Sequence, residues 1–120
     1  MNGNSNNELV LTGKSADYLG IEGKLRYEAR LKAIAEGGLV KTHDYTLIVE
    51  NADAVTLYLA AATNFVSYND VSGDAHHRVQ ASLSNLLQKN YTNIRAAHIK
   101  DYQQLFNRLS FQLPVTINSY

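Results

Sequence analysis

KLRYEARLKAIAE, residues 24–36, alternates charged with apolar side chains from Lys24 to Ala33. The charged residues take the even positions and the apolar residues take the odd positions. Leu, Ala, Glu and Arg are good helix formers, so propensity alone favours a helix here. A helix would spread the charges around its circumference, whereas a strand gathers them on one face. The period of two therefore predicts a long strand with one apolar face.

The neighbouring segments alternate short strands with turns. Strands are predicted at 8–13, 39–41, 45–49 and 54–63, with a loop over 14–23 and turns at 37–38, 43–44 and 51–53. Connections this short favour antiparallel pairing. The run AVTLYLAAAT, residues 54–63, is nearly all apolar, which predicts a central strand covered on both faces.

Two amphipathic helices follow the strands. Asp74 is a good N-cap for a helix over about 75–89, and Thr92 can cap a second helix over about 92–108. The apolar stripe of the first helix consists of Val79, Leu83, Leu86 and Leu87. Residues 109–113 alternate again and predict a final strand. The fold class is therefore α+β, an antiparallel sheet packed against two C-terminal helices.

Length and composition describe one small domain. The 120 residues include no cysteine, which excludes disulfides, thiolate catalysis and cysteine metal sites. Lys plus Arg and Asp plus Glu number 11 each, so little positive field is available to attract nucleic acid or a membrane surface. Residues 1–7 form a polar linker without signal-peptide features, residues 8–113 the domain, and residues 114–120 a tail.

Three groups of polar residues suggest a functional site, but each also has a simpler structural explanation. His76 and His77 are adjacent on a helix, where they point about 100° apart, so they are expected to be solvated rather than to share a metal ion. Residues 69–74 place oxygens as a calcium loop does, but Ala81 stands where the distal Glu would be needed, which favours a helix-capping loop. Arg26, Glu28 and Arg30 lie two residues apart on one strand face, where an anion or sugar-acid site is the functional alternative, but a solvated row of ion pairs is expected.

A fourth grouping lies on the second predicted helix. Ile94, His98, Asp101 and Leu105 share one face, which places a polar pair within an apolar stripe. A buried polar pair needs partners, so His98 and Asp101 are expected to form a hydrogen-bonded lock between helix and sheet. Catalysis with His98 as base and Asp101 orienting it is the alternative.

The loop after residue 63 carries the candidate carbohydrate contacts. Asn64, Tyr68, Asn69 and Asp70 combine an aromatic ring with amide and carboxylate groups, which are the residue types that hold a sugar. Loop aromatics also serve simply as anchors. No catalytic triad, phosphate loop or paired carboxylates emerge, so no catalytic residue, cofactor or metal is expected.

Four blocks in order carry a family resemblance that covers nearly the whole chain. They are GKLRYEARL at 23–31 followed by AEGG at 35–38, NADAVTLYLAAATNF at 51–65, NDVSGD at 69–74, and AHIKDYQQLFNRLS at 97–110. Their order and spacing resemble the N-terminal domain of glycoside hydrolase family 95, the α-L-fucosidases and related α-L-galactosidases.

The resemblance implies a parent enzyme whose N-terminal β-sandwich and helical linker precede a catalytic (α/α) barrel. That barrel hydrolyses terminal α-linked fucose with inversion, and no catalytic residue of the family falls on this chain. The sheet would then be the later part of the sandwich, with the linker helices after it. The partners implied are the barrel and fucosylated glycans, and the parent is expected to be periplasmic or secreted in a bacterium.

The resemblance also has a physical consequence for the chain by itself. A sandwich strand is covered on both faces. If the second sheet is missing, one face stays open, and an exposed apolar patch or self-association through that face is expected. Three hypotheses remain: an accessory domain of a fucosidase-like hydrolase, an autonomous glycan-binding module, and a structural domain without ligand.

Overall fold

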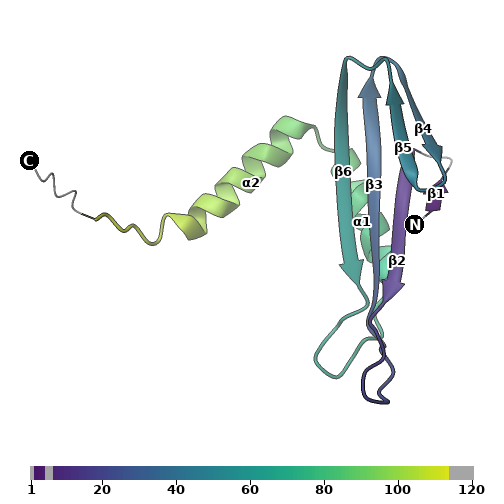
Figure 1. The fold of residues 1–120 in the computed structure, drawn as a ribbon. Helices are drawn as coiled ribbons and strands as arrows, with labels where there is room; N and C mark the ends of the chain where they lie inside the picture. Colours follow the sequence, from purple (N-terminus) through teal and green to yellow (C-terminus); the bar gives the residue numbers. More distant parts are fainter. Residues whose placement is uncertain (1, 5–6, 114–120) are drawn as a thin grey trace, which may run out of the picture. The chain divides into compact units, whose positions relative to one another are not determined.

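The computed structural model describes residues 2–4 and 7–113, and it divides the chain into two units, residues 1–88 and 89–120. The first unit holds the described strands and helix α1, and the second holds helix α2 (Figure 1). The elements are β1 (Asn2–Asn4), β2 (Glu8–Lys14), β3 (Arg26–Glu36), β4 (Leu39–His43), β5 (Thr46–Glu50), β6 (Ala54–Thr63), α1 (Ala75–Leu87) and α2 (Tyr91–Phe106).

Strand β3 is the centre of an antiparallel sheet with the order β1-β2-β3-β6. Leu31 faces Leu9 of β2 on one side and Leu59 of β6 on the other. The long strand predicted from the alternation is confirmed. At one end of the β2–β3 ladder, Gly13 faces Tyr27, whose ring occupies the space that a Cβ at residue 13 would need.

The turn at Gly37-Gly38 exists, but it does not create the expected pairing. Both glycines have positive φ angles, 70° and 64°, which suits their lack of a Cβ. The strand after them, β4, pairs with β5 in a separate two-stranded sheet, and β3 pairs with β6 instead. β6 matches β3 along Tyr27–Glu36, so this partner satisfies more backbone groups than the five-residue β4 could.

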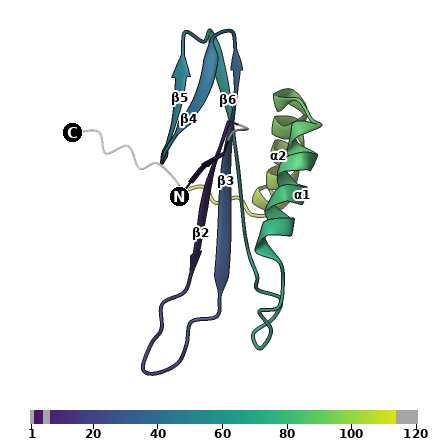
Figure 2. The same ribbon diagram turned by 90° about the vertical axis from the view of Figure 1, so that its right-hand side faces the viewer.

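The β4–β5 hairpin lies over the sheet face opposite α1 (Figure 2). β4 contacts β1 and β3, and β5 contacts β2. Leu9 and Ala33 on that face are buried, as is Val40 of β4. The hairpin therefore covers only the part of this face built by β1, β2 and one end of β3.

Helix α1 covers the other face, where it contacts β6 and β3. Val79 and Leu83 are buried and form the core of this layer with Ala60 of β6. The helix begins as predicted, because the Asp74 side chain accepts a hydrogen bond from His77 N at 3.0 Å. The predicted stripe is thus confirmed at its centre, while Leu87 in the last turn is exposed.

Two expectations about the faces of the sheet are wrong. The charged face of β3 lies beneath α1, so Glu28 and Arg30 are buried rather than solvated. β6 is an edge strand rather than a central one, and Leu57 and Leu59 on its apolar face are 58% and 67% exposed. Both errors share one cause. Helix α1 packs on the even-numbered residues Tyr58, Ala60 and Ala62 of β6, and the charged side chains of β3 lie on that same face, so they are buried beneath the helix.

The second unit contains α2, and none of the residues Tyr91–Phe106 is buried. Asn90 caps this helix through Asn93 N at 2.8 Å, so the cap predicted at Thr92 is two residues late. The strand predicted at 109–113 is absent from the described residues, because the alternating side chains there have no partner strand and are exposed. Within the described ranges, neither helix has the length and apolar character needed to cross a bilayer.

Because the core beneath α1 is small, a single substitution in it should lower the free energy of unfolding markedly. Replacing Leu83 with Ala removes a large part of the contact between α1 and β6, and we expect it to lower the free energy of unfolding by about 3 kcal/mol. Ser84→Ala, one residue along on the exposed side of α1, should change it by less than about 0.5 kcal/mol. Urea denaturation followed by circular dichroism measures both, and equal effects would contradict the assignment of the core.

Candidate functional site

Two loops lie side by side beyond the same end of the sheet, as Figures 1 and 2 both show. Residues 15–25 connect β2 to β3, and residues 64–74 connect β6 to α1. Each loop closes on itself with a short bridge, Tyr18 with Ile21 and Ser67 with Asp70. We call this region the two-loop end.

Asn64 ties the two loops together. Its Oδ1 accepts from Arg26 N at 2.7 Å, and its Nδ2 donates to Lys24 O at 3.2 Å and to Val71 O at 2.7 Å. The residue is buried, and its amide is fully engaged with backbone groups of both loops. Asn64, predicted as a sugar contact, therefore holds the loops in place. The sequence could not show this, because the partners lie up to 40 positions away.

Arg78 of α1 provides a second brace for the loop 64–74. Its Nη1 donates to Thr63 O at 2.8 Å and to Phe65 O at 2.7 Å. Gly73 passes close by, and a Cβ there would lie 2.8 Å from the Arg78 guanidinium. Further along the loop, Asp70 Oδ1 accepts from Ser72 N at 2.8 Å. The hydrogen bonds from Ser72 lower the pKa of Asp70, so it stays ionised and fixed in the turn.

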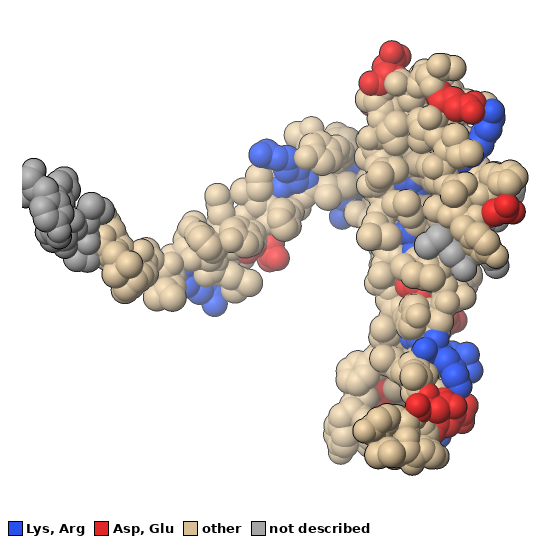
Figure 3. Space-filling view, in the orientation of Figure 1, with Lys and Arg blue, Asp and Glu red and all other residues tan. Residues whose placement is uncertain are grey.

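The tips of both loops expose large side chains. Tyr68 is 94% exposed, and Asn69 beside it is exposed while its Oδ1 accepts from the Ser67 hydroxyl. The other exposed apolar or aromatic residues here are Tyr18, Leu19, Ile21, Phe65 and Val66. Figure 3 shows this end as mostly uncharged surface beside a group of acidic and basic side chains. The first loop also carries two ion pairs, since Lys14 pairs with Asp17 and with Glu22. The sequence prediction included Tyr68 and missed the first loop.

A cleft of about 530 Å³ lies between the first turn of α1 and the adjoining ends of β2 and β3. Glu28 lines this cleft, and its side chain is only 8% exposed. Its Oε1 accepts from Arg30 Nε at 2.6 Å, and its Oε2 lies 3.1 Å from His76 Nδ1. Arg30 also pairs with Glu8 at 3.4 Å, and Lys32 reaches Glu8 at 2.9 Å.

The ionisation of Glu28 follows from these contacts. Burial raises its pKa, but the hydrogen bonds and charges of Arg30 and His76 together outweigh that effect and leave the pKa below its usual value. His76, expected to be solvated, is half exposed and belongs to this ion cluster. A carboxylate held ionised in this way accepts hydrogen bonds well, but it is poorly suited to donate a proton as a general acid.

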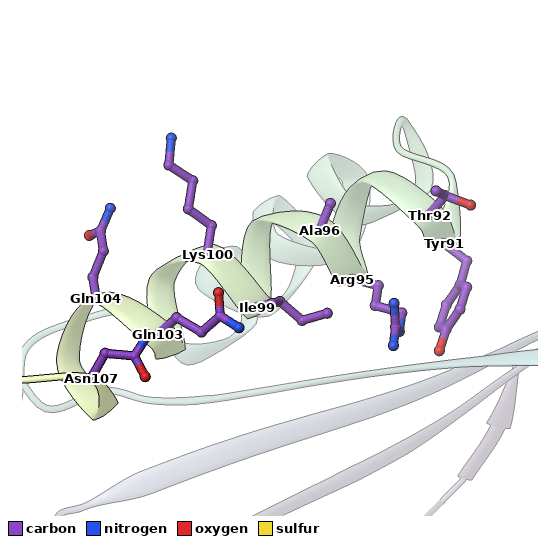
Figure 4. Close-up of a pocket in the computed structure, with 9 residues that line it drawn as sticks. All are labelled: Tyr91, Thr92, Arg95, Ala96, Ile99, Lys100, Gln103, Gln104 and Asn107. Atoms are coloured by element: carbon purple, nitrogen blue, oxygen red, sulfur yellow. The ribbon is translucent and has the colours of Figure 1, made fainter. Parts of the chain in front are cut away.

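The polar pair predicted on α2 lies in the second unit. His98 and Asp101 are both exposed, and no hydrogen bond among the described residues joins them. His98 instead stacks on Tyr102 with ring centroids 6.3 Å apart, and Tyr102 stacks on Phe106 at 5.0 Å. The lock between helix and sheet stays a prediction. A hollow of about 910 Å³ along α2 is lined only by side chains of this helix and its C-cap, so it is a helix face and not an enclosed site (Figure 4).

The ion cluster predicts a pH dependence. Because the pKa of Glu28 is lowered in the folded state, its stabilisation is present above the unfolded pKa, near 4.5, and is lost as the pH falls through the folded pKa. We expect Glu28→Gln to lower the free energy of unfolding by about 3 kcal/mol at pH 7, with the difference shrinking below about pH 4.5.

The matched control is Glu22→Gln, which removes an exposed partner of Lys14 and should cost less than about 0.5 kcal/mol at any pH. Urea denaturation at a series of pH values measures both variants. A cost for Glu28→Gln that is the same at pH 2.5 and pH 7 would contradict the role assigned to the cluster.

Comparison with known proteins places this arrangement in a family. Residues 2–68, more than half of the chain, match the model described as "Glycosyl hydrolase family 65, N-terminal domain". The "Probable alpha-fucosidase A" of Aspergillus niger is 26% identical over 120 residues, which is 90% of this chain and 15% of the relative. The "Alpha-L-fucosidase 2" of Arabidopsis thaliana is 32% identical over 102 residues, which is 81% of this chain and 12% of the relative.

The chain thus spans a small part of both relatives, at a size that suits one domain of a longer protein. The resemblance to an N-terminal domain of a glycoside hydrolase is confirmed, and the finer assignment to family 95 stays a prediction. On the match over residues 2–68, the chain belongs to the family of glycosyl hydrolase family 65 N-terminal domains.

Proposed function

We propose that this chain is a non-catalytic accessory domain of an α-L-fucosidase-like glycoside hydrolase. The family match and the two relatives named as fucosidases support this proposal. Hydrolysis of terminal α-linked fucose, with inversion, would be the work of a barrel domain elsewhere in the parent protein. The periplasmic or secreted location expected of that parent belongs to the same proposal.

Three acidic side chains of the first unit support an accessory role. Glu28 is held ionised by Arg30 and His76, which is the wrong state for a general acid. Asp74 caps α1, and the hydrogen bond from His77 N lowers its pKa. Asp70 holds the turn of the second loop. Each of these carboxylates stabilises local structure, and glycoside hydrolysis needs a carboxyl group that can exchange its proton.

The single observation that carries the proposal is the two-loop end. Asn64 and Arg78 brace the loop backbones with side-chain hydrogen bonds, while Tyr18, Leu19 and Tyr68 extend into solvent. Exposed apolar groups on a braced backbone are typical of a contact surface, because little ordering entropy remains to be lost on docking. We therefore propose that this end contacts the barrel at the rim of its active site.

The test is a substitution at Tyr68 in the parent enzyme. Tyr68→Ala removes the most exposed ring of the two-loop end, and we expect kcat/KM for a fucosylated oligosaccharide to fall about tenfold, as for an aromatic contact worth roughly 1.4 kcal/mol. The control is Tyr45→Ala in the β4–β5 turn, where an exposed ring is lost away from this end. Equal kcat/KM values for the two variants would contradict the proposal.

An autonomous glycan-binding module is the second candidate, favoured by the exposure of Tyr68 beside Asn69 and Asp70. Titrating the chain with fucosylated oligosaccharides should then shift the backbone amide signals of residues 67–70. An absence of shifts there would exclude this candidate. A structural domain without ligand would remain if Tyr68→Ala also left the parent enzyme unaffected.

A further inference from the structure

The outer edge of β6 carries backbone groups that none of the described strands uses. Ala33 N donates to Asn7 O, so the odd residues of β3 point their backbone N–H and C=O groups toward β2. The even residues of β3 point theirs toward β6. Asn64 N donates to Arg26 O at 3.0 Å, so the even residues of β6 and β3 form the hydrogen-bonded pairs between these two strands. The odd residues of β6 therefore point their N–H and C=O groups away from β3.

Thr63 confirms this direction and closes one end of the edge. Its carbonyl accepts from Arg78 Nη1 at 2.8 Å, and β3 does not use it. The odd residues that remain are Val55, Leu57, Leu59 and Ala61, and no hydrogen bond among the described residues engages their outward groups. The free edge therefore consists of the outward N–H and C=O groups of these four alternate residues, and the Arg78 guanidinium lies at one end of it.

Strand β6 itself carries none of the features by which edge strands usually resist pairing. Natural edge strands carry charges, proline or bulges, or they are short. β6 spans ten residues, AVTLYLAAAT, without charge or proline, and it pairs with β3 without interruption. The opposite edge, β1, has only three residues. The side chains of Leu57 and Leu59 flank the free groups on the face away from α1, and both are exposed.

We propose that two copies of the chain pair through antiparallel β6 strands, with Leu57 of one copy opposite Leu59 of the other. Facing residues of a hydrogen-bonded antiparallel pair exchange both N–H···O bonds, and only the odd residues of β6 point these groups outward, so odd residues must meet odd residues. In this register Val55 meets Ala61 and Leu57 meets Leu59, which uses every free residue of both edges in about eight hydrogen bonds. The pairing is two-fold symmetric and closes at the dimer.

Charge also favours this partner. β6 has no charged side chain, so a second copy brings no like charges together along the strand. At each end, Asp53 of one copy comes opposite Thr63 of the other, whose carbonyl already holds the Arg78 guanidinium. The dimer does not depend on the function proposed above, since it follows from the edge of β6 alone.

The first experiment is sedimentation of the full chain and three variants. The chain should be a dimer, and Leu59→Pro should make it a monomer, because that N–H points outward and its loss leaves the β3 ladder intact. Leu57→Lys should also give a monomer. Leu11→Lys, on the same face but in β2, should leave the dimer intact. A monomeric chain, or a dimer broken equally by Leu11→Lys, would overturn the proposal.

The second experiment tests the register and does not depend on how well the proline variant folds. The chain contains no cysteine, so introduced thiols report only on the chosen positions. Facing residues lie about 5.5 Å apart at Cα, within the range of a disulfide, whereas identical residues would be offset diagonally beyond it. A mixture of Leu57→Cys and Leu59→Cys chains should cross-link on oxidation, and neither variant alone should do so. Cross-linking of either variant alone, or none in the mixture, would overturn the register.

Discussion

The Glu28–Arg30 ion pair allows α1 to lie on the charged face of β3. Two charged groups taken out of water are costly unless their remaining hydrogen-bonding capacity is met. Here Glu8 takes a second part of the Arg30 guanidinium and His76 reaches the Glu28 carboxylate, so each charge has more than one partner. Because α1 covers this face of the sheet, the apolar side chains of Leu57 and Leu59 on the other face of β6 remain exposed.

The sheet face under α1 combines the charged side chains of β3 with apolar residues of β6, whereas the opposite face is apolar and only partly covered. Apolar faces normally determine which side of a sheet is buried. In this chain the packing of Val79 and Leu83 against Ala60, with Tyr58 and Ala62 beside them, determines the covered face. Leu57 and Leu59 of β6 lie on the other face and are exposed.

Local patterns predicted local structure well. The alternation in residues 24–36 identified β3 against its helix propensity, and Asp74 was correctly predicted as the cap of α1. Long-range choices could not be predicted in the same way. Apolar composition cannot distinguish a central strand from an edge strand at residues 54–63, because the difference lies in the neighbours. The same limitation applies to the prediction for Asn64. Its residue type suits a sugar contact, but its hydrogen bonds go to backbone groups far away in the sequence.

The contact between Gly13 and Tyr27 has a consequence for the evolution of this domain. The tyrosine ring fills the space that any other residue at position 13 would need for its side chain, and the two residues face each other across the β2–β3 ladder. Relatives that keep an aromatic residue at the second position should therefore keep glycine at the first. Where the glycine has been lost, the aromatic ring should have been lost with it, so the two columns of a family alignment should change together.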